Sequence, residues 1–264
     1  MSIVLQFPRG DQSKNLQRIK STYTAREISR QFGLSEKSIR RWTQKGIIQP
    51  VSPESDGELR YDFRALAKFR RVRELRNQGL TNRQIEAEMH GQLNLFPERG
   101  GRLIQLPVKL TPFEEALLLH EKGDKRAMPM YLKAIAEGEF VSDAYCNLGI
   151  LAYQEADVPQ AFDHFTNALR HDPRHFEAHL NLANLYFEAS DVRLARLHYQ
   201  ICAVIEPNSA SPHLNLGLLY AIDSELVPAI ESLNRAKEHG TEEELAQIEE
   251  LLAGLRKAMK ERKD

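Results

Sequence analysis

The sequence has few cysteines, a single tryptophan and no long hydrophobic run. Its two cysteines, Cys146 and Cys202, are too few for a disulfide framework or a cysteine-based metal cluster. No apolar stretch approaches the roughly 18 residues that a membrane-spanning helix needs. Residues 1–9 lack the basic leader and the small-residue cleavage site of a signal peptide. Phosphate-binding glycine loops, zinc-protease motifs and nucleophile elbows are also missing. We therefore expect a soluble, cytoplasmic protein that is not an enzyme, uses no metal or cofactor and does not bind membranes.

The net charge of −1 conceals two halves of opposite sign. Residues 1–106 contain 20 lysines and arginines against 11 acidic residues, whereas residues 107–264 contain 16 basic and 26 acidic residues. A length of 264 residues fits two ordinary domains. A basic half joined to an acidic half is typical of a chain in which one part binds a polyanion. Two domains of accidentally opposite charge are the alternative.

Helix start and stop signals divide the basic half into four short helices. Thr24 and Glu27 form a capping box, and the helix that they begin ends at Gly33. A second helix runs from Ser35 to Gly46, a third covers residues 63–78 after Asp62, and a fourth follows another capping box at Thr81. Between the second and third helices, short apolar segments flank the polar residues 51–57. This order predicts a helix-turn-helix followed by a small β-hairpin, or wing.

Six short segments of the basic half together form a recognisable ordered series. They are Tyr23-Thr24, Gly33-Leu34-Ser35, Ile39-Arg40-Arg41-Trp42, Gly46-Ile47-Ile48-Gln49-Pro50, Arg60-Tyr61 and Gly79-Leu80-Thr81. Through this series, residues 23–89 resemble the MerR-type winged helix-turn-helix family. The resemblance implies a dimeric transcription regulator that binds double-stranded DNA and bends or untwists it. The chain departs from the family after the fourth helix, because prolines and glycines in residues 91–107 exclude the long dimerisation helix that is usual there. The cysteines of metal-sensing members are also missing.

The predicted DNA contacts follow from this arrangement. Exposed cations on the second helix can enter the major groove, where arginine donates two hydrogen bonds to a guanine edge. Side chains on the wing are placed to contact flanking phosphates. Our candidate DNA-binding residues are Lys37, Arg40, Arg41, Trp42, Arg60, Tyr61 and Arg64. Trp42 as a core residue, and the arginine-rich third helix as a merely solvated face, are the alternatives.

The acidic half repeats with a period of 34 residues. Positions in register across three copies are Asn147-Leu148-Gly149, Asn181-Leu182-Ala183 and Asn215-Leu216-Gly217, then Ala161, Ala195 and Ala229, then Phe165, Tyr199 and Leu233, then Ala168, Cys202 and Ala236. This pattern resembles the tetratricopeptide repeat (TPR), a helix-turn-helix unit. A weaker copy precedes these from Thr111. A final helix is expected after Thr241. We interpret it as a capping helix rather than a dimer zipper, because repeat arrays need a cap.

The recurring asparagines are candidate peptide-binding residues. Asn147, Asn181 and Asn215 occupy the position where some TPR proteins hold an extended peptide backbone, and an amide side chain can both donate to and accept from that backbone. A mere compositional preference at this position is the alternative. Asp143, Glu177 and Glu188 make the predicted groove acidic and favour a basic or neutral segment, for which the DNA-binding half of another subunit is one candidate. We interpret His175 and His179 as solvated or packed residues, since two histidines alone make a poor metal site.

The sequence thus predicts a mainly α-helical protein: a winged helix-turn-helix with a small β-hairpin wing, then an α-helical TPR solenoid with a C-terminal capping helix. The expected parts are a flexible extension (1–22), a MerR-like DNA-binding domain (23–90), a linker (91–107), one degenerate and three clear repeats (108–241), and the capping helix and tail (242–264). The predicted function is transcription regulation by a homodimer whose TPR part binds a protein or peptide partner or mediates self-association. A scaffold or adaptor, whose winged domain serves protein contacts, and a non-regulatory DNA-binding accessory factor are the alternatives.

Overall fold

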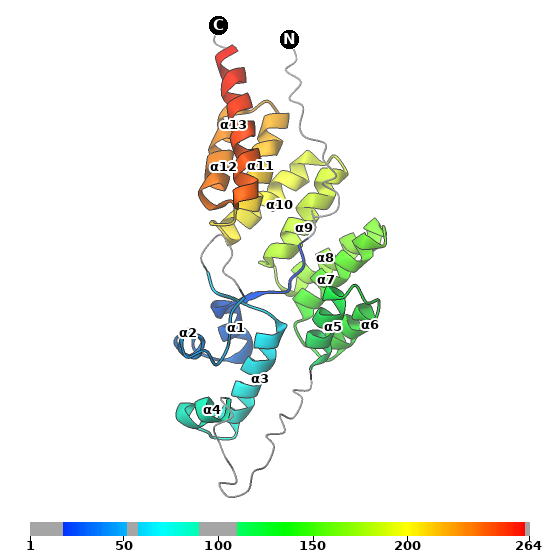
Figure 1. Cartoon of the computed structure of the whole chain (residues 1–264). Coiled ribbons are helices and arrows are strands. Elements are labelled where there is room, and N and C mark those ends of the chain that lie inside the picture. Colours follow the sequence, from blue (N-terminus) through cyan, green and yellow to red (C-terminus); the bar gives the residue numbers. More distant parts are fainter. Residues whose placement is uncertain (1–17, 52–57, 90–109, 262–264) are drawn as a thin grey trace, which may run out of the picture. The chain divides into compact units, whose positions relative to one another are not determined.

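The computed structural model of the chain describes residues 18–51, 58–89 and 110–261 (Figure 1). These parts are mainly helical and contain one two-stranded antiparallel sheet. The elements, in chain order, are β1 (Tyr23–Thr24), α1 (Ala25–Phe32), α2 (Glu36–Gln44), β2 (Arg60–Tyr61), α3 (Phe63–Asn77), α4 (Asn82–Met89), α5 (Pro112–Glu121), α6 (Ala127–Ala136), α7 (Val141–Gln154), α8 (Val158–His171), α9 (Phe176–Glu188), α10 (Val192–Ile205), α11 (Ala210–Ile222), α12 (Leu226–His239) and α13 (Glu242–Glu261). None of these helices is long and apolar enough to cross a lipid bilayer.

Contacts divide the chain into two compact units, which we describe separately. The first unit in the chain, the helix-turn-helix unit, covers residues 21–139. The other, the repeat unit, includes the described residues 140–261 together with residues 18–20. The predicted linker, residues 91–107, lies outside the described residues.

The helix-turn-helix unit begins with the predicted capping box. The hydroxyl of Thr24 accepts a hydrogen bond from the amide of Glu27, and the Glu27 carboxylate accepts one from the Thr24 amide. Gly33 then ends α1 with a φ of 65°, a conformation that glycine adopts without strain. This turn leads directly into Ser35, whose hydroxyl caps α2.

The small sheet of this unit differs from a simple hairpin. Strand β2 pairs with β1, with Tyr61 opposite Tyr23 and Arg60 opposite Thr24, and Val51 bridges to Arg60 from the other side. The tip of the predicted wing, residues 52–57, lies outside the described residues. Strand β1 therefore joins the sheet, a pairing between distant segments that local sequence signals do not predict.

Helices α5 and α6, predicted as a degenerate repeat, group by their contacts with the helix-turn-helix unit. Helix α5 begins with the expected capping box between Thr111 and Glu114, with Pro112 in its first turn. The Arg70 guanidinium on α3 contacts the buried Glu114 carboxylate at 3.0 Å. This ion pair ties α3 to α5.

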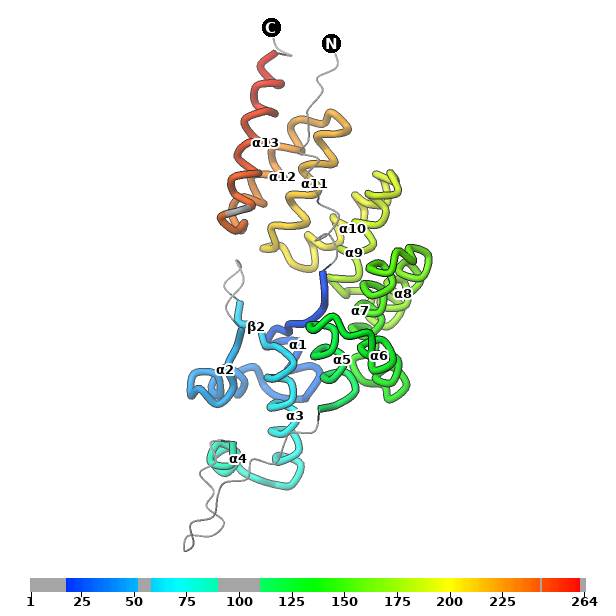
Figure 2. The backbone as a smooth tube through the Cα atoms, turned by 45° about the vertical axis from the view of Figure 1, so that its right-hand side comes forward, coloured from blue at the N-terminus to red at the C-terminus, as the bar shows by residue number. Residues whose placement is uncertain are grey.

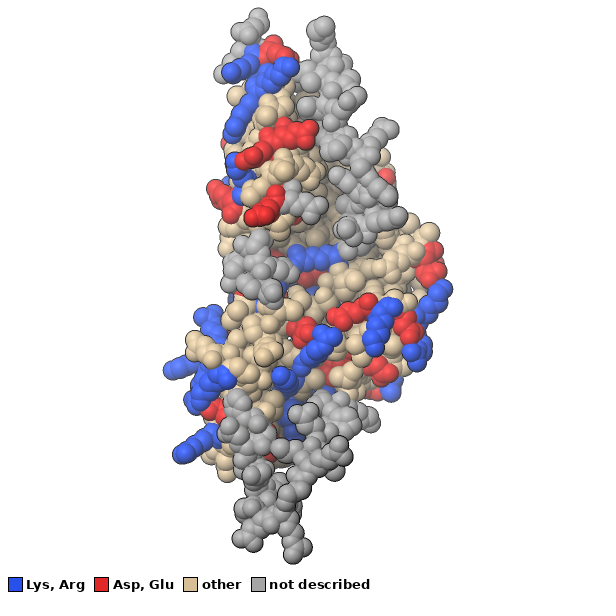
Figure 3. All heavy atoms as spheres, viewed as in Figure 1, with Lys and Arg blue, Asp and Glu red and all other residues tan. Residues whose placement is uncertain are grey.

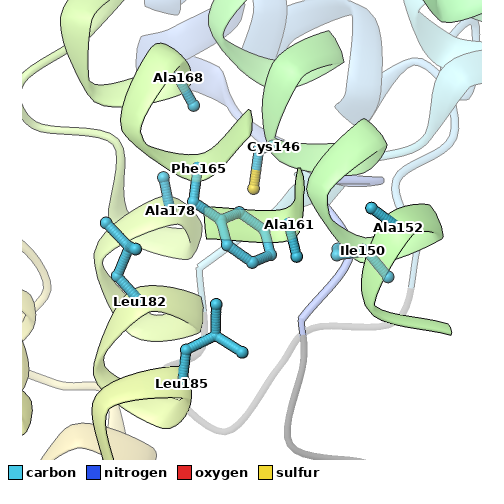
Figure 4. Close-up of a cluster of buried hydrophobic side chains, with 9 residues drawn as sticks. All are labelled: Cys146, Ile150, Ala152, Ala161, Phe165, Ala168, Ala178, Leu182 and Leu185. Carbon is cyan, nitrogen blue, oxygen red and sulfur yellow. The ribbon is translucent and has the colours of Figure 1, made fainter. Parts of the chain in front are cut away.

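In the repeat unit, α7 to α12 form three successive antiparallel pairs, which can be followed along the tube in Figure 2. The 34-residue register places small or aromatic residues where the paired helices approach. Ala161, Phe165 and Ala168 are fully buried in the first pair, beside Cys146 (Figure 4). A Cβ atom added to Gly149 would lie 2.6 Å from the Phe165 ring, so the glycine permits this close packing.

The final helix, α13, packs against the last repeat. Its residues Ile248, Leu252 and Leu255 are buried in one cluster with Ala229 and Leu233 of α12. The apolar face that could have formed a zipper is thus covered by the chain's own repeat, as a capping helix requires.

Candidate nucleic-acid interface and repeat groove

Helix α2 presents three of the predicted DNA-binding cations to solvent. Lys37, Arg40 and Arg41 are exposed, whereas Ile39 and Trp42 on the opposite side are buried. The alternation follows from the 3.6-residue period of a helix, since apolar residues three apart face the core. In the space-filling view, Lys and Arg side chains gather where Figure 1 draws α2 (Figure 3).

An acidic residue of α4 lies beside this basic face. The Glu86 carboxylate contacts the Arg41 guanidinium at 2.8 Å and also accepts a hydrogen bond from Lys45. The hydrogen bond from Lys45, together with the charges of Arg41 and Lys45, lowers the pKa of Glu86. Arg40 forms a longer contact of 3.6 Å with Glu36. Arg41 therefore has to exchange one anionic partner for another if it contacts DNA.

Three predicted DNA-binding residues lie instead in the core. Trp42, Arg60 and Tyr61 have at most 2% of their surface exposed. The Tyr61 ring packs edge-on against Phe69, and its hydroxyl lies 2.7 Å from that of Thr43. Tyr61 is therefore packed against α2 and α3, and neither it nor Arg60 has the exposure expected of a wing residue. We therefore omit these three from the candidate interface.

Arg64 remains on the surface at the start of α3. Its guanidinium contacts Asp62 at 2.9 Å and lies over the Phe63 ring, 4.5 Å from the ring centre. Other arginines of the same helix have structural partners, since Arg71 contacts Glu88 at 2.6 Å. The basic third helix is thus partly a set of ion pairs that hold the unit together.

The repeat unit carries the three predicted peptide-binding asparagines at equivalent positions of α7, α9 and α11. Asn147 and Asn181 are fully buried, and Asn215 is partly exposed. The first two bind a segment of the same chain, residues 18–20. Asn147 accepts from the Lys20 amide at 2.9 Å and donates to the Lys20 carbonyl at 3.0 Å. Asn181 forms the same pair of bonds with Arg18, at 2.7 and 3.1 Å.

The side chains of this segment have their own contacts. The Lys20 ammonium lies 3.3 Å from the Glu177 carboxylate, and both side chains are buried. His175 adjoins this pair, with its Nε2 atom 3.4 Å from Asp143. Ile19 packs against the buried cluster of α7 to α9 that Figure 4 shows. We call Asn147, Asn181, Glu177 and the surface between them the repeat groove.

The position of residues 18–20 in this groove differs from the flexible extension that the sequence predicts for residues 1–22. Residues 1–17 lie outside the described part of the chain. The available signal was charge complementarity: a basic-aliphatic-basic triplet stands near the N-terminus, and Asp143 and Glu177 lie on the repeat helices. Glu188, the third predicted acidic residue, accepts a hydrogen bond from the Tyr153 hydroxyl at 2.7 Å.

Both cysteines, and also His179, have packing or hydrogen-bonding partners within the repeat unit. Cys146 and Cys202 are buried between helices, and burial raises the pKa of both thiols. His179 lies against His198 at 2.9 Å and against the Pro173 carbonyl. No group of three or more potential metal ligands occurs in the part of the chain that the structure describes.

Comparison with known proteins identifies the helix-turn-helix unit. Residues 23–92 match the family model described as MerR HTH family regulatory protein. No curated protein matches the sequence.

Among solved structures, similar chains include YrrB, described as a TPR protein with an unusual peptide-binding site. It has 19% identity and a TM-score of 0.49, over 57% of this chain and 77% of that one. MamA from Desulfovibrio magneticus RS-1 has 15% identity and a TM-score of 0.44, over 58% of this chain and 96% of that one. Residues 23–92 thus match the MerR HTH family, and the 34-residue register and the paired helices described above are those of TPR-type repeats.

Proposed function

We propose that this chain is a non-catalytic, DNA-binding transcription regulator whose repeats bind a protein or peptide partner. The observation that carries the proposal is the MerR family match over residues 23–92, on a unit whose α2 presents Lys37, Arg40 and Arg41 to solvent. The recognition helix of a helix-turn-helix protein enters the major groove of DNA.

Within this proposal each exposed cation has a distinct role. Arg40 and Arg41 are able to donate paired hydrogen bonds to guanine edges, which distinguishes base pairs. Lys37 and Arg64 contact phosphates, which fixes the register of the protein on the duplex without reading sequence. Release of Arg41 from Glu86 accompanies binding. A single small domain reads few base pairs, so we propose a homodimer on two half-sites, paired through the repeat unit.

The test is a fluorescence-anisotropy titration of labelled genomic duplex fragments with the full chain. Because bound cations release counterions, the logarithm of the affinity falls linearly with the logarithm of the salt concentration, by about 0.9 per neutralised phosphate. Replacing both Arg40 and Arg41 by alanine weakens binding by about tenfold or more, at about 1–3 kcal/mol per base contact.

The matched control is Arg126→Ala. Arg126 is an exposed arginine of the same unit, paired with Asp124 and remote in sequence from α2. This variant should bind DNA as the wild type does. If the double variant and the wild type bind equally, or if neither binds at low salt, the regulator proposal is wrong.

The second candidate function is an adaptor whose winged domain contacts protein. One observation favours it: Glu86 neutralises part of the basic face by contacting Arg41 and Lys45. The same titration decides between the two functions, because an adaptor binds no duplex DNA at any salt concentration. A non-regulatory DNA-binding accessory factor would bind DNA in this assay but leave promoter activity unchanged in a reporter assay.

A further inference from the structure

The repeat groove holds residues 18–20 through their backbone. Asn147 and Asn181 each both donate to and accept from one residue, and the two residues held, Lys20 and Arg18, are two apart. Alternate residues of an extended chain face the same side, so this spacing suits an extended segment. These four hydrogen bonds use only backbone atoms of the segment and therefore select its conformation and not its sequence.

Sequence selection comes from the side chains, and foremost from Lys20. A buried ammonium needs a counter-charge, because desolvation of an unpaired charge is costly. Glu177, 3% exposed, supplies it at 3.3 Å. Burial alone would raise the pKa of Glu177, but the charges of Lys20 and His175 outweigh that effect and lower it to about 2. With Lys20 in place, the Glu177 carboxylate is therefore ionised at neutral pH, and each buried charge has the other as its partner.

The two preceding positions of the segment extend the pattern. Ile19 packs against the apolar cluster of α7 to α9. The Arg18 guanidinium lies over the Phe176 ring, 5.6 Å from its centre, within reach of a cation–π interaction. The groove thus accommodates a basic residue, an aliphatic residue and a lysine in succession.

We propose that residues 18–20 are a resident ligand of the repeat groove, bound in cis, and that the groove's protein partner carries an extended basic-aliphatic-lysine segment that displaces them. This inference rests on the proposed partner-binding role of the repeats. Since the resident segment is tethered, it competes at a high effective concentration and lowers the apparent affinity for any partner. Only three residues make the described contacts, so a longer segment can replace them.

The test uses a fluorescein-labelled peptide of residues 14–23, titrated against the full chain. Lys20→Ala weakens the resident ligand but leaves the groove residues in place, so this variant should bind the peptide about tenfold more tightly than the wild type does. The matched control, Lys133→Ala, removes an exposed lysine outside the groove and should bind as the wild type does. Adding Asn147→Ala to the Lys20→Ala chain should abolish the gain.

Peptide specificity gives the second arm. A peptide in which alanine replaces the residue equivalent to Lys20 should bind the Lys20→Ala chain about tenfold more weakly than the unaltered peptide. Equal binding of the two peptides, or equal affinity of the wild type and the Lys20→Ala chain, would overturn the proposal.

A measurement on the wild type keeps the test independent of folding in the variants. Saturating peptide should accelerate hydrogen exchange at the Lys20 amide, which donates to Asn147 in the resident state. Unchanged exchange under saturation would identify the segment as a fixed part of the fold and sink the proposal. So would a wild-type dimer that dissociates in the Asn147→Ala variant, because the segment would then come from a second copy. DNA affinity is measured in the same samples. A failure of the resident-ligand proposal can then be distinguished from a failure of the proposed DNA-binding function.

Discussion

At the scale of single residues, the ion pair between Lys20 and Glu177 joins two segments 157 positions apart. Both side chains are nearly inaccessible, so while the segment stays in the groove neither charge is solvated after its partner is removed. Breaking a buried pair by removing one partner costs about 3–5 kcal/mol when the other charge stays buried. The lysine can avoid that cost by leaving the groove with its segment.

The first prediction concerns Glu177→Gln. The substitution keeps the shape of the side chain but removes its charge, and we expect the Lys20 amide to exchange its hydrogen about tenfold faster or more, equivalent to about 1.4 kcal/mol. Glu231→Gln, which removes an exposed carboxylate of α12, is the control and should leave that exchange unchanged. Equal protection in both variants would mean that the ion pair does not hold the segment.

We expect buried His120 of α5 to make the stability of the helix-turn-helix unit depend on pH. The residue is 7% exposed, and its Nδ1 atom lies 3.1 Å from the Tyr131 hydroxyl. Burial lowers the pKa of His120 to about 4 from an ordinary value of 6.5. Between these two pH values the unfolded chain binds a proton that the folded chain excludes. The stability that depends on neutral His120 is therefore fully present above pH 6.5 and is lost as the pH falls toward 4.

The second prediction tests this sign with His120→Asn. Asparagine retains a polar atom near the Tyr131 hydroxyl but does not titrate. The free energy of unfolding of the variant should therefore fall less steeply between pH 6.5 and 4.5, by at most about 1.4 kcal/mol per pH unit. Urea unfolding across this range measures the slope. Tyr131→Phe, which keeps the histidine, should retain the wild-type slope; identical slopes for wild type and His120→Asn would refute the assignment.

At the scale of elements, each repeat is stabilised by side chains between its two helices. Phe165 of α8 is fully buried between α7, α8 and α9, and Gly149 of α7 leaves room for its ring. Val204 of α10 is a natural contrast, since it is 74% exposed although it also lies on the second helix of a repeat. Position in the 34-residue register, rather than hydrophobicity alone, thus decides how much a residue contributes to the stability of the repeat unit.

The third prediction follows from that contrast. Phe165→Ala should lower the free energy of unfolding of the repeat unit by about 3–5 kcal/mol, because it removes a buried ring and leaves a cavity. Val204→Ala should change it by less than about 0.5 kcal/mol. Urea denaturation followed by far-ultraviolet circular dichroism compares the two. Similar losses in both variants would contradict the assigned packing.

Sequence reasoning succeeded where signals were local or periodic. The capping boxes at Thr24 and Thr111 and the 34-residue register each depend on residues close in sequence or repeated at fixed spacing, and the structure contains them. It failed where distant segments pair. Strand β2 pairs with β1, more than 35 residues earlier, Tyr61 packs against Thr43 and Phe69, and the contacts of Lys20 lie on helices beyond residue 140. Exposure of a side chain depends on tertiary packing. The basic or aromatic character of Arg60 and Tyr61 therefore did not reveal that they are buried.

At the scale of the whole molecule, the chain contains two units with separate hydrophobic cores. The helix-turn-helix unit is built around residues such as Ile39, Trp42 and Phe69, and the repeat unit around the clusters of α7 to α13. Units that have their own cores are able to fold as separate cooperative units. Residues 18–20 belong by contacts to the repeat unit, although the chain continues from them directly into β1.

The fourth prediction uses the single tryptophan as a reporter of one unit. Trp42 is 1% exposed in the helix-turn-helix unit, so its fluorescence follows that unit, whereas circular dichroism follows all helices. In the Phe165→Ala variant, the repeat unit should unfold at lower urea than in the wild type, and the tryptophan transition should keep its midpoint. The circular-dichroism curve should then show a first step without a fluorescence change. If both signals move together to lower urea, the two cores unfold as one cooperative system, and destabilising the repeats would directly destabilise the proposed DNA-binding domain.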